Sequence, residues 1–390
     1  MENKEMLKAI LTLIRAAFGQ KAEIADDIDW EKLYLYASKH HVANIVCYAL
    51  DSLKIKPEKK VYDAFKTEQM RALRTDMLQE REIDAILKEY EEQNIKAVAL
   101  KGFVLKGMYP LRDMRVMGDL DLLLKREDIP RGHEILIKNG YTEIVEEYQD
   151  KETNPHEEYR KPPIMLLELH KFLFPKKGFE EIFDYYEHIW DRCVTVGEYK
   201  NIYRMNDEEF YIYMIFHIMK HYKLAGTGIR SILDVWVFLK DTRIDRGYVD
   251  GVLEKLGMKK FEEHIRTLAE IWFDEKESDD PLYDEMGEYI FESGTYGTEK
   301  NYKTRDALDA DGKNASGIKY MLNIAFPGYK SMCMLYPSLE KIPVALPVYW
   351  IVRIIDRLIH KREDLKKEIE ISSDTKYLEK LKKHFDEVGV

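Results

Sequence analysis

The sequence predicts an α+β fold, in which a small mixed β-sheet with flanking helices is embedded between an N-terminal helical region and a C-terminal, mainly helical domain. Three observations predict it. Helical spacing of apolar residues dominates residues 1–92, short apolar runs alternate with short helical segments in residues 93–178, and helical spacing returns in residues 179–390. We expect these three parts to be separate units of the chain.

The N-terminal part is predicted to be helical almost throughout. In residues 61–90, apolar side chains recur at mostly three-to-four spacing among many charges. Residues 1–20 carry charges within their apolar stretch and lack a small-residue cleavage site, so we expect an amphipathic helix and not a signal peptide. The helical pattern breaks at residues 91–94, where the texture of the sequence changes.

The middle part is predicted to contain strands and short helices in alternation. Residues 95–101 indicate a first strand that ends at Gly102, and Pro110 prevents the short helix after it from continuing. A helix with Pro130 in its first turn and Gly140 at its end is expected next. The remaining segments are a second strand at 119–125, strand-like residues at 141–148, a polar loop at 151–163 and a strand at 164–172.

The C-terminal part is predicted to be helical from residue 179 onward. Asn206 and Glu209 have the spacing of a capping box, and the helix that they begin runs to Gly226. A second helix is expected over residues 229–240. Residues 342–355 are apolar but too few to span a bilayer, and they contain two prolines, so we expect no membrane segment.

Composition narrows the class of protein. Of the 390 residues, 45% are hydrophobic and 34% are charged, as in ordinary soluble globular proteins. The net charge of −11 makes a nucleic acid partner unlikely, because phosphate binding needs positive charge. Three scattered cysteines without a CxxC pair indicate neither a cysteine zinc site nor a disulfide framework, which suits the cytoplasm. Nothing in the sequence indicates an oligomer.

Two aspartates lie in an otherwise apolar run, MGDLDLLLK. In a strand, residues two apart point to the same face, so Asp119 and Asp121 project together. Two neighbouring carboxylates repel each other unless a cation lies between them. Mg²⁺ is the hard, oxygen-seeking ion that fits such a pair, with Mn²⁺ as the alternative. An isolated DxD is nevertheless more often a strand end or a solvated edge.

A third acid occurs in a similar setting. Glu168 lies in IMLLELHKF, again within an apolar strand, and His170 follows two residues later on the same side. If this strand lies beside the one with Asp119 and Asp121, three carboxylates converge on one edge of the sheet. His170 could orient a substrate or a carboxylate, although a structural hydrogen bond explains it equally well.

The order of these features resembles a known family. Leu100-Lys101-Gly102, Tyr109-Pro110, Arg115 and GDLDLL, which begins at Gly118, are similar to the phrase LKG…YP…R…GDIDLLV. This phrase is typical of the bacterial uncharacterised nucleotidyltransferases, a branch of the DNA polymerase β-like nucleotidyltransferase superfamily. HxxKHxxxxGxGIRxxLD, at residues 217–234, and residues 325–355 are also similar to this branch.

The resemblance implies a fold, an activity and site residues. It implies a nucleotidyltransferase core in residues 93–178 and transfer of a nucleoside monophosphate from an NTP, with ATP as the first choice, to an acceptor hydroxyl. Asp119 and Asp121 would bind Mg²⁺, and Glu168 would be the third carboxylate, holding a second ion or helping to deprotonate the hydroxyl. Gly102 would let backbone amides approach the phosphates.

The sequence departs from the family pattern after this glycine. The superfamily usually has Gly-Ser or Gly-Gly, whereas this chain has Gly102-Phe103, so a serine hydroxyl for the phosphates is missing. Nearby cations would have to replace it, and Lys101, Lys106 and Arg115 are the candidates. Each of them could instead be an ordinary surface cation.

A helix with two histidines could form the second wall of the cleft. His217 and His221 lie four residues apart, but without HExxH or a further ligand a zinc site is not indicated. Lys220, His221 and Arg230 could approach the nucleotide from the helical domain. Alternatively, Arg230 forms an intrahelical ion pair with Asp234, four residues later.

We therefore expect a magnesium-dependent nucleotidyltransferase that acts on a small molecule, sugar, peptide or protein. One alternative is a protein that holds a nucleotide without turning it over, such as an antitoxin-like or regulatory component. Another is a transferase that moves a phosphoryl group, such as phosphocholine, onto a cell-surface sugar. The three acids favour catalysis, and the missing serine weighs against it.

Overall fold

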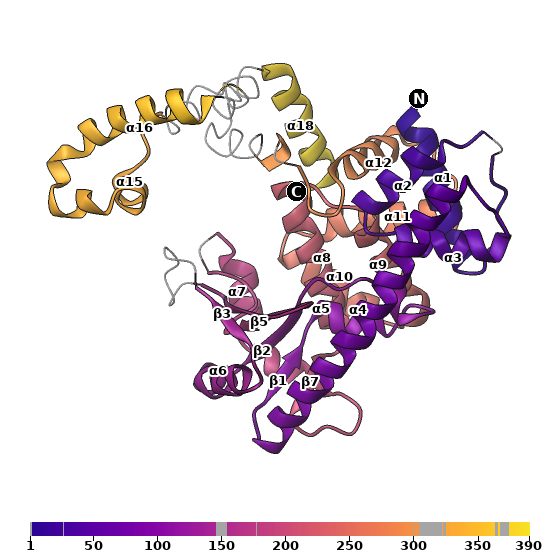
Figure 1. Cartoon of the computed structure of the whole chain (residues 1–390), viewed down its shortest axis with the longest axis horizontal. Helices are drawn as coiled ribbons and strands as arrows, with labels where there is room; N and C mark the ends of the chain where they lie inside the picture. The colour runs from indigo at the N-terminus through magenta and orange to yellow at the C-terminus, as the bar shows by residue number, and fades with distance from the viewer. Residues whose placement is uncertain are drawn as a thin grey trace.

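The computed structural model describes residues 2–25, 27–145, 154–176, 178–298, 300–302, 304, 322, 325–362, 366 and 374–390. Helices surround one mixed β-sheet, as predicted (Figure 1). The N-terminal part consists of four helices, of which the last runs for 34 residues along the sheet. They are α1 (Glu2–Ala17), α2 (Trp30–Lys39), α3 (Ala43–Leu53) and α4 (Lys59–Glu92).

The sheet has seven strands in the order β3-β4-β5-β2-β1-β7-β6. The pairs β2–β5 and β1–β7 are parallel, and the other pairs are antiparallel. The strands are β1 (Ala97–Ala99), β2 (Leu120–Leu124), β3 (Thr142–Ile144), β4 (His156–Lys161), β5 (Met165–His170), β6 (Cys193–Thr195) and β7 (Ile202–Met205).

Three predictions about these strands were wrong. Strand β4 lies in the segment predicted to be a polar loop, and β6 and β7 lie after residue 178, where only helices were predicted. Strand β1 ends at Ala99, and Gly102 belongs to helix α5 (Lys101–Lys106) instead of closing the strand. The strand predicted at 141–148 is observed as β3, while residues 146–148 of that prediction lie outside the described residues.

The remaining helices cover the sheet and form the C-terminal part. Helix α8 begins after Asn206, whose side chain accepts a hydrogen bond from the Glu209 amide, as expected of a helix cap. The other α-helices are α6 (Ile129–Lys138), α7 (Glu180–Tyr186), α8 (Asp207–Leu224), α9 (Ile229–Asp241), α10 (Arg246–Lys255), α11 (Lys259–Phe273), α12 (Pro281–Ser293), α15 (Tyr329–Leu335), α16 (Leu346–His360) and α18 (Thr375–Val388). Short 3₁₀ helices are Arg112–Met114, Arg126–Asp128, Ile189–Arg192, Pro337–Lys341 and Pro343–Ala345.

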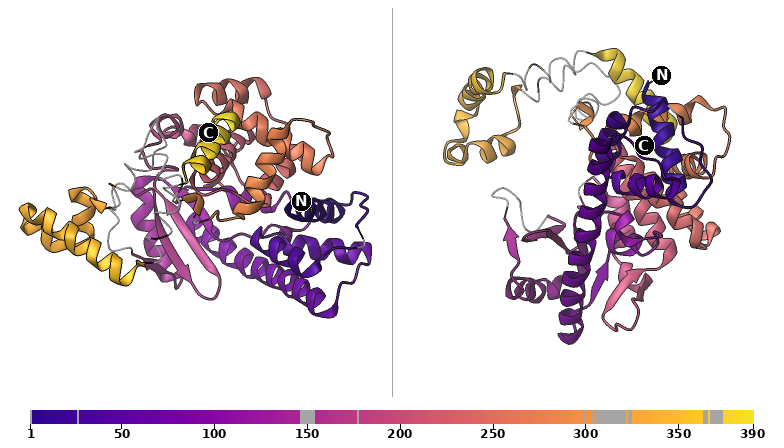
Figure 2. Two further views of the ribbon diagram at one scale, coloured as in Figure 1. Left: turned by 90° about the horizontal axis from the view of Figure 1, so that it is seen from above. Right: turned by 45° about the vertical axis from the view of Figure 1, so that its right-hand side comes forward.

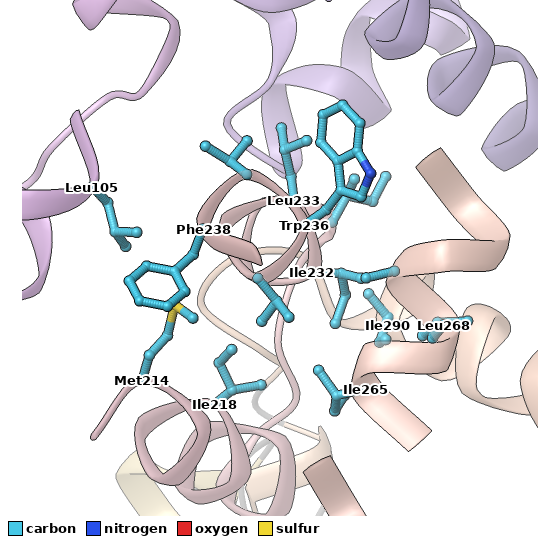
Figure 3. Packing of buried hydrophobic residues seen from close by; sticks show 14 of the residues in the cluster. Leu105, Met214, Ile218, Ile232, Leu233, Trp236, Phe238, Ile265, Leu268 and Ile290 are labelled. Atoms are coloured by element: carbon cyan, nitrogen blue, oxygen red, sulfur yellow. The ribbon is translucent and has the colours of Figure 1, made fainter. Parts of the chain in front are cut away.

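The two faces of the sheet belong to different hydrophobic cores. Leu122 and Leu124 of β2 pack in a cluster with α4 and α6, whereas Leu123 joins the large cluster of the helical body. In that body, Met214 of α8 lies near Phe238 of α9 (Figure 3). Because side chains alternate along a strand, Asp121 faces the same side of the sheet as Leu123. The strand thus directs this carboxylate toward the helical body.

Helices α15 and α16 form an arm that stands away from the main body (Figure 2). Helix α16 exposes an apolar stripe that includes Val348, Ile351 and Ile355. Among the described residues, no helix is long and apolar enough to cross a bilayer.

Candidate active site

Strand register brings the acidic side chains together. Strands β2 and β5 are parallel neighbours, which fulfils the condition for the acids to converge, and Asp121 is paired with Glu168. Asp119 lies just before the first residue of β2, two residues from Asp121. Carboxylate oxygens of Asp119, Asp121 and Glu168 lie within 4.8 Å of one another. This spacing is suited to three ligands of one divalent ion.

The pKa values of the two aspartates are shifted in opposite directions. Burial, followed by repulsion from Asp121 and Glu168, raises the pKa of Asp119 to about 6. Burial raises the pKa of Asp121, but the hydrogen bond and the positive charge of His170 outweigh it, so the pKa of Asp121 is lowered. No basic side chain of a described residue forms an ion pair with Asp119. A bound cation would supply the missing positive charge.

His170 touches two of the acids. Its Nε2 atom lies 3.3 Å from Asp121 Oδ1 and 3.2 Å from Glu168 Oε2. Burial lowers the pKa of His170, but these two contacts outweigh it and raise the pKa to about 9. Without a metal ion, His170 is therefore a cation at neutral pH that partly balances the carboxylates.

The acids open into a cavity of about 400 Å³ between the sheet and the helical body. Ten of the residues that the sequence singled out as site candidates line it, and Lys106 does not: the ten are Lys101, Gly102, Arg115, Gly118, Asp119, Asp121, Glu168, His170, His221 and Arg230. A larger cavity of about 610 Å³ elsewhere, beside Phe216 and Met258, contains none of these carboxylates. The chemistry of the smaller cavity makes it the candidate active site.

Lysines and histidines line the same cavity as the acids. Lys101 Nζ donates a hydrogen bond to His217 Nδ1 at 3.0 Å, which holds this side chain in place at the N-terminus of α5. Burial lowers the pKa of Lys101 to about 8 and also lowers the pKa of Lys220. Burial likewise lowers the pKa of His221 to about 3, so this ring is neutral. A buried cation without a full countercharge would be stabilised by an anionic ligand.

Arg115 and Arg230 connect the segment before β2 to other parts of the protein through side-chain contacts. Arg115 forms a bidentate ion pair with Asp234, at 2.9 and 3.0 Å, and the Tyr109 hydroxyl donates to the same carboxylate at 2.8 Å. Arg230 Nη1 donates to the Val116 carbonyl at 3.0 Å. The alternative of an ion pair between Arg230 and Asp234 was wrong, because Asp234 is bound by Arg115 from another part of the chain.

Lys106, the remaining candidate cation, and the two candidate glycines differ in how closely they pack against their neighbours. Lys106 is buried and lies 2.7 Å from Asp76, so it is neither a surface cation nor a residue of the cavity. Gly102 packs against Met117, because a Cβ atom there would lie 2.8 Å from the Met117 side chain. At Gly118, by contrast, a Cβ would meet no described atom within 4 Å.

Sequence reasoning missed His156, Tyr213 and Asp234 as part of this site. His156 and Tyr213 line the cavity, and Asp234 anchors Arg115 behind it. The signal for His156 was its place in a histidine-bearing strand, but the segment was interpreted as a loop. Tyr213 lies one turn before His217 on the same helix and could have been found from that spacing.

Comparison with known proteins agrees with this geometry. The model of a family described as uncharacterised nucleotidyltransferase matches residues 26–274, which include the sheet and helices α8 and α9. No curated protein matches the chain. Since the family match covers more than half of the sequence, this chain belongs to the uncharacterised nucleotidyltransferase family and is a transferase of that class.

Proposed function

We propose that the protein is a magnesium-dependent enzyme that transfers a nucleoside monophosphate from an NTP, ATP in the first place, to the hydroxyl of an acceptor. The observation that carries this proposal is the convergence of Asp119, Asp121 and Glu168 in a cavity that Lys101 and Lys220 also line. The acceptor would be a small molecule, a sugar, a peptide or a protein.

The donor set fits magnesium. Three carboxylates supply hard oxygen ligands, and burial together with repulsion from Asp121 and Glu168 raises the pKa of Asp119, so a cation beside Asp119 would be favourable. Asp119, Asp121 and Glu168 would hold the ion or ions. When bound, magnesium would neutralise charge on the triphosphate and on the attacking and leaving oxygens. Manganese, which accepts the same oxygen ligands, could replace it.

In the proposed reaction, the acceptor oxygen forms a bond to the α-phosphorus while the bond from that phosphorus to the bridging oxygen breaks. Pyrophosphate leaves, and the hydroxyl proton passes to a carboxylate or to water. Lys101 and Lys220 would bind the phosphates, which compensates for the missing serine. Arg115, held by Asp234, and Arg230, bonded to the backbone before the acidic pair, would position the strand that carries the aspartates.

Calorimetry tests the proposal before the acceptor is known. ATP binding is measured with and without Mg²⁺ for the wild type and for Asp119→Asn/Asp121→Asn. We expect Mg²⁺ to raise the affinity of the wild type at least tenfold and to have no effect on the double variant. Equal affinity in both proteins would show that the carboxylates are not the metal site. Transfer of label from α-³²P-NTPs to a panel of acceptors then tests the chemistry.

A further inference from the structure

Two histidines lie beside Glu168: His170 follows it on β5 and also contacts Asp121, and His156 comes from β4, the neighbouring strand on the other side of β5 from β2. Strands β4 and β5 are antiparallel, and His156 is paired directly with His170, while Glu158 is paired with Glu168. Residues paired across strands project from the same face. The two imidazole rings therefore meet beside the acids, with their centroids 4.9 Å apart.

These side chains converge on one carboxylate oxygen. Glu168 Oε2 lies 3.5 Å from His156 Nδ1 and 3.2 Å from His170 Nε2. His156, Glu168 and His170 each offer one possible ligand atom, and these three atoms lie within 4.8 Å of one another. Glu168 thus belongs to two groups of possible ligands, one with the two aspartates and one with the two histidines.

One of the two nitrogens that face Glu168 makes no hydrogen bond. His156 Nδ1 is buried and has no hydrogen-bond partner among the described residues, although it lies 3.5 Å from Glu168 Oε2. The unpartnered nitrogen of His170 is its Nδ1 atom, whereas its Nε2 atom faces the acids. The His170 side chain is only 9% exposed. A buried polar atom without a partner is costly, and an ion or an ordered molecule normally satisfies it. The His156 nitrogen that faces Glu168 is therefore available to bind an ion.

The ligand types distinguish the two groups. Three carboxylates favour Mg²⁺, whereas imidazole nitrogens favour first-row transition ions, and one carboxylate completes a mixed nitrogen and oxygen set. We propose that His156, His170 and Glu168 bind a second divalent ion, a first-row transition metal, beside the magnesium site, and that the Glu168 carboxylate is shared by both ions. This inference rests on the proposed function and extends it to a mixed-metal centre.

Neighbouring residues support such a site. Glu158 Oε1 lies 3.4 Å from His156 Nε2, so it would orient this ring while Nδ1 faces Glu168. His156 and Pro155 line the cavity together with Glu168 and His170, so water or an acceptor oxygen could reach the ion. A hydroxyl bound there would lose its proton more readily.

Manganese is the probe for the experiment, because Mn²⁺ accepts both oxygen and nitrogen ligands and is visible by electron paramagnetic resonance. The full chain is stripped with EDTA and titrated with MnCl₂. Electron spin echo envelope modulation then detects ¹⁴N nuclei bound to Mn²⁺. We expect two Mn²⁺ per chain and clear ¹⁴N modulation in the wild type. Excess Mg²⁺ should displace one Mn²⁺ and leave the ¹⁴N signal.

Substitutions assign the nitrogens. In His156→Ala and His170→Asn, the ¹⁴N modulation should weaken, and in the double variant it should vanish while one Mn²⁺ remains. His188→Ala, which alters an exposed histidine outside the cavity, is the matched control and should leave the spectrum unchanged. Thermal melting in EDTA verifies that each variant folds.

Two results would overturn the inference: a wild-type spectrum without ¹⁴N modulation, or unchanged modulation in a folded double variant. The wild-type spectrum decides even if the double variant does not fold. Failure here is separate from failure of the proposed function, because the Mg²⁺ dependence of ATP binding is measured with the aspartate variants. An oxygen-only Mn²⁺ spectrum with Mg²⁺-dependent ATP binding would remove the mixed site and keep the transferase.

Discussion

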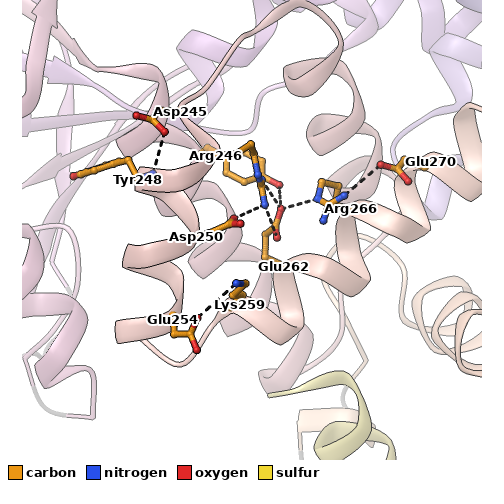
Figure 4. A network of polar contacts seen from close by, with 10 residues as sticks. Asp245, Arg246, Tyr248, Asp250, Glu254, Lys259, Glu262, Arg266 and Glu270 are labelled. Atoms are coloured by element: carbon orange, nitrogen blue, oxygen red, sulfur yellow. Dashed lines mark hydrogen bonds and ion pairs between the residues drawn. The ribbon is translucent and has the colours of Figure 1, made fainter.

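Glu262 and Asp119 are both acids in sheltered places, yet the chain treats them in opposite ways. The Glu262 side chain is fully buried, and its Oε1 atom is 3.0 Å from Arg246, 3.1 Å from Arg266 and 2.6 Å from the Tyr211 hydroxyl (Figure 4). Burial raises its pKa, but the hydrogen bonds from Arg246 and Tyr211 outweigh this and lower the pKa. Asp119 has acidic neighbours instead, and its pKa is raised.

The comparison separates acids that stabilise the fold from acids that await a ligand. Where a carboxylate holds helices together, the sequence supplies arginine. Where the carboxylates line the cavity, Asp119 has two carboxylates as neighbours, and no described residue forms an ion pair with it. Charge that the fold leaves unbalanced is available for a metal ion and a triphosphate. Four experiments can break or sharpen this distinction.

The largest effect is expected at the structural acid. Glu262→Gln removes a charge that Arg246 and Arg266 both contact, and it should lower the free energy of unfolding by about 2–4 kcal/mol. Urea denaturation measures the loss, which should be the same with and without Mg²⁺. A loss below about 0.5 kcal/mol would remove the contrast with Asp119.

Substitution of Asp119 should have the opposite effect on the free energy of unfolding. A native pKa of about 6 exceeds the usual value near 4, so the native state binds the extra proton between these values. Stability contributed by Asp119 is therefore lost as pH rises through this window, and Asp119→Asn should stabilise the metal-free chain above pH 6. The gain should be on the order of 1–3 kcal/mol in EDTA at pH 7.5.

The same variant can be controlled within one experiment. At pH 4 the gain should nearly disappear, since the wild-type carboxyl is then protonated in the native state. Mg²⁺ should raise the melting temperature of the wild type and not that of Asp119→Asn. Destabilisation by Asp119→Asn in EDTA would show that this carboxylate is already balanced by the fold.

Substitution of Lys220, a lysine that lines the cavity, should have a smaller effect, and it should appear in the affinity for ATP. Lys220→Ala should weaken Mg²⁺-ATP binding about tenfold, because a partly desolvated cation in the cavity loses its phosphate contact. Lys223→Ala lies one turn further along α8, is exposed and does not line this cavity, so it is the matched control. Calorimetry should show a change of less than twofold for Lys223→Ala. Equal losses would indicate only long-range attraction.

The smallest effect concerns pH. Lys101 has a pKa lowered to about 8, so above pH 8 it loses its proton in the free protein and must regain one to bind phosphate as a cation. ATP affinity should fall by up to about twofold from pH 7 to 8, where half of Lys101 has lost its proton, and by a few-fold in all by pH 9. Lys101→Gln should bind more weakly and show no such fall. A wild-type affinity that stays constant to pH 9.5 would exclude Lys101 from phosphate binding.

Much of the site could be predicted because its signal is local. Acids in apolar strands violate the usual hydrophobic pattern, so Asp119, Asp121 and Glu168 stand out in the sequence. The strand pattern also gave their common face. Which strands pair is a non-local property, so the pairing of the two acidic strands could be stated from the sequence only as a condition.

The missed features have physical causes. Strand β4 buries only Tyr159 and has polar residues at its other positions, so its sequence looks like a loop. Strands β6 and β7 are three and four residues long, too short to show a clear period. Asp234 had a plausible partner four residues away, and its true partner, Arg115, is 119 residues distant in sequence.

The parallel pairing of β2 with β5 has a consequence for how the protein matures. Asp121 and Glu168 become neighbours only after the intervening hairpin-like excursion through α6, β3 and β4 has closed. A divalent ion held by these acids would then bind late on the folding route, and a truncated chain that stops before residue 165 would have no complete set of ligands. Divalent ions should accordingly slow unfolding far more than they accelerate folding.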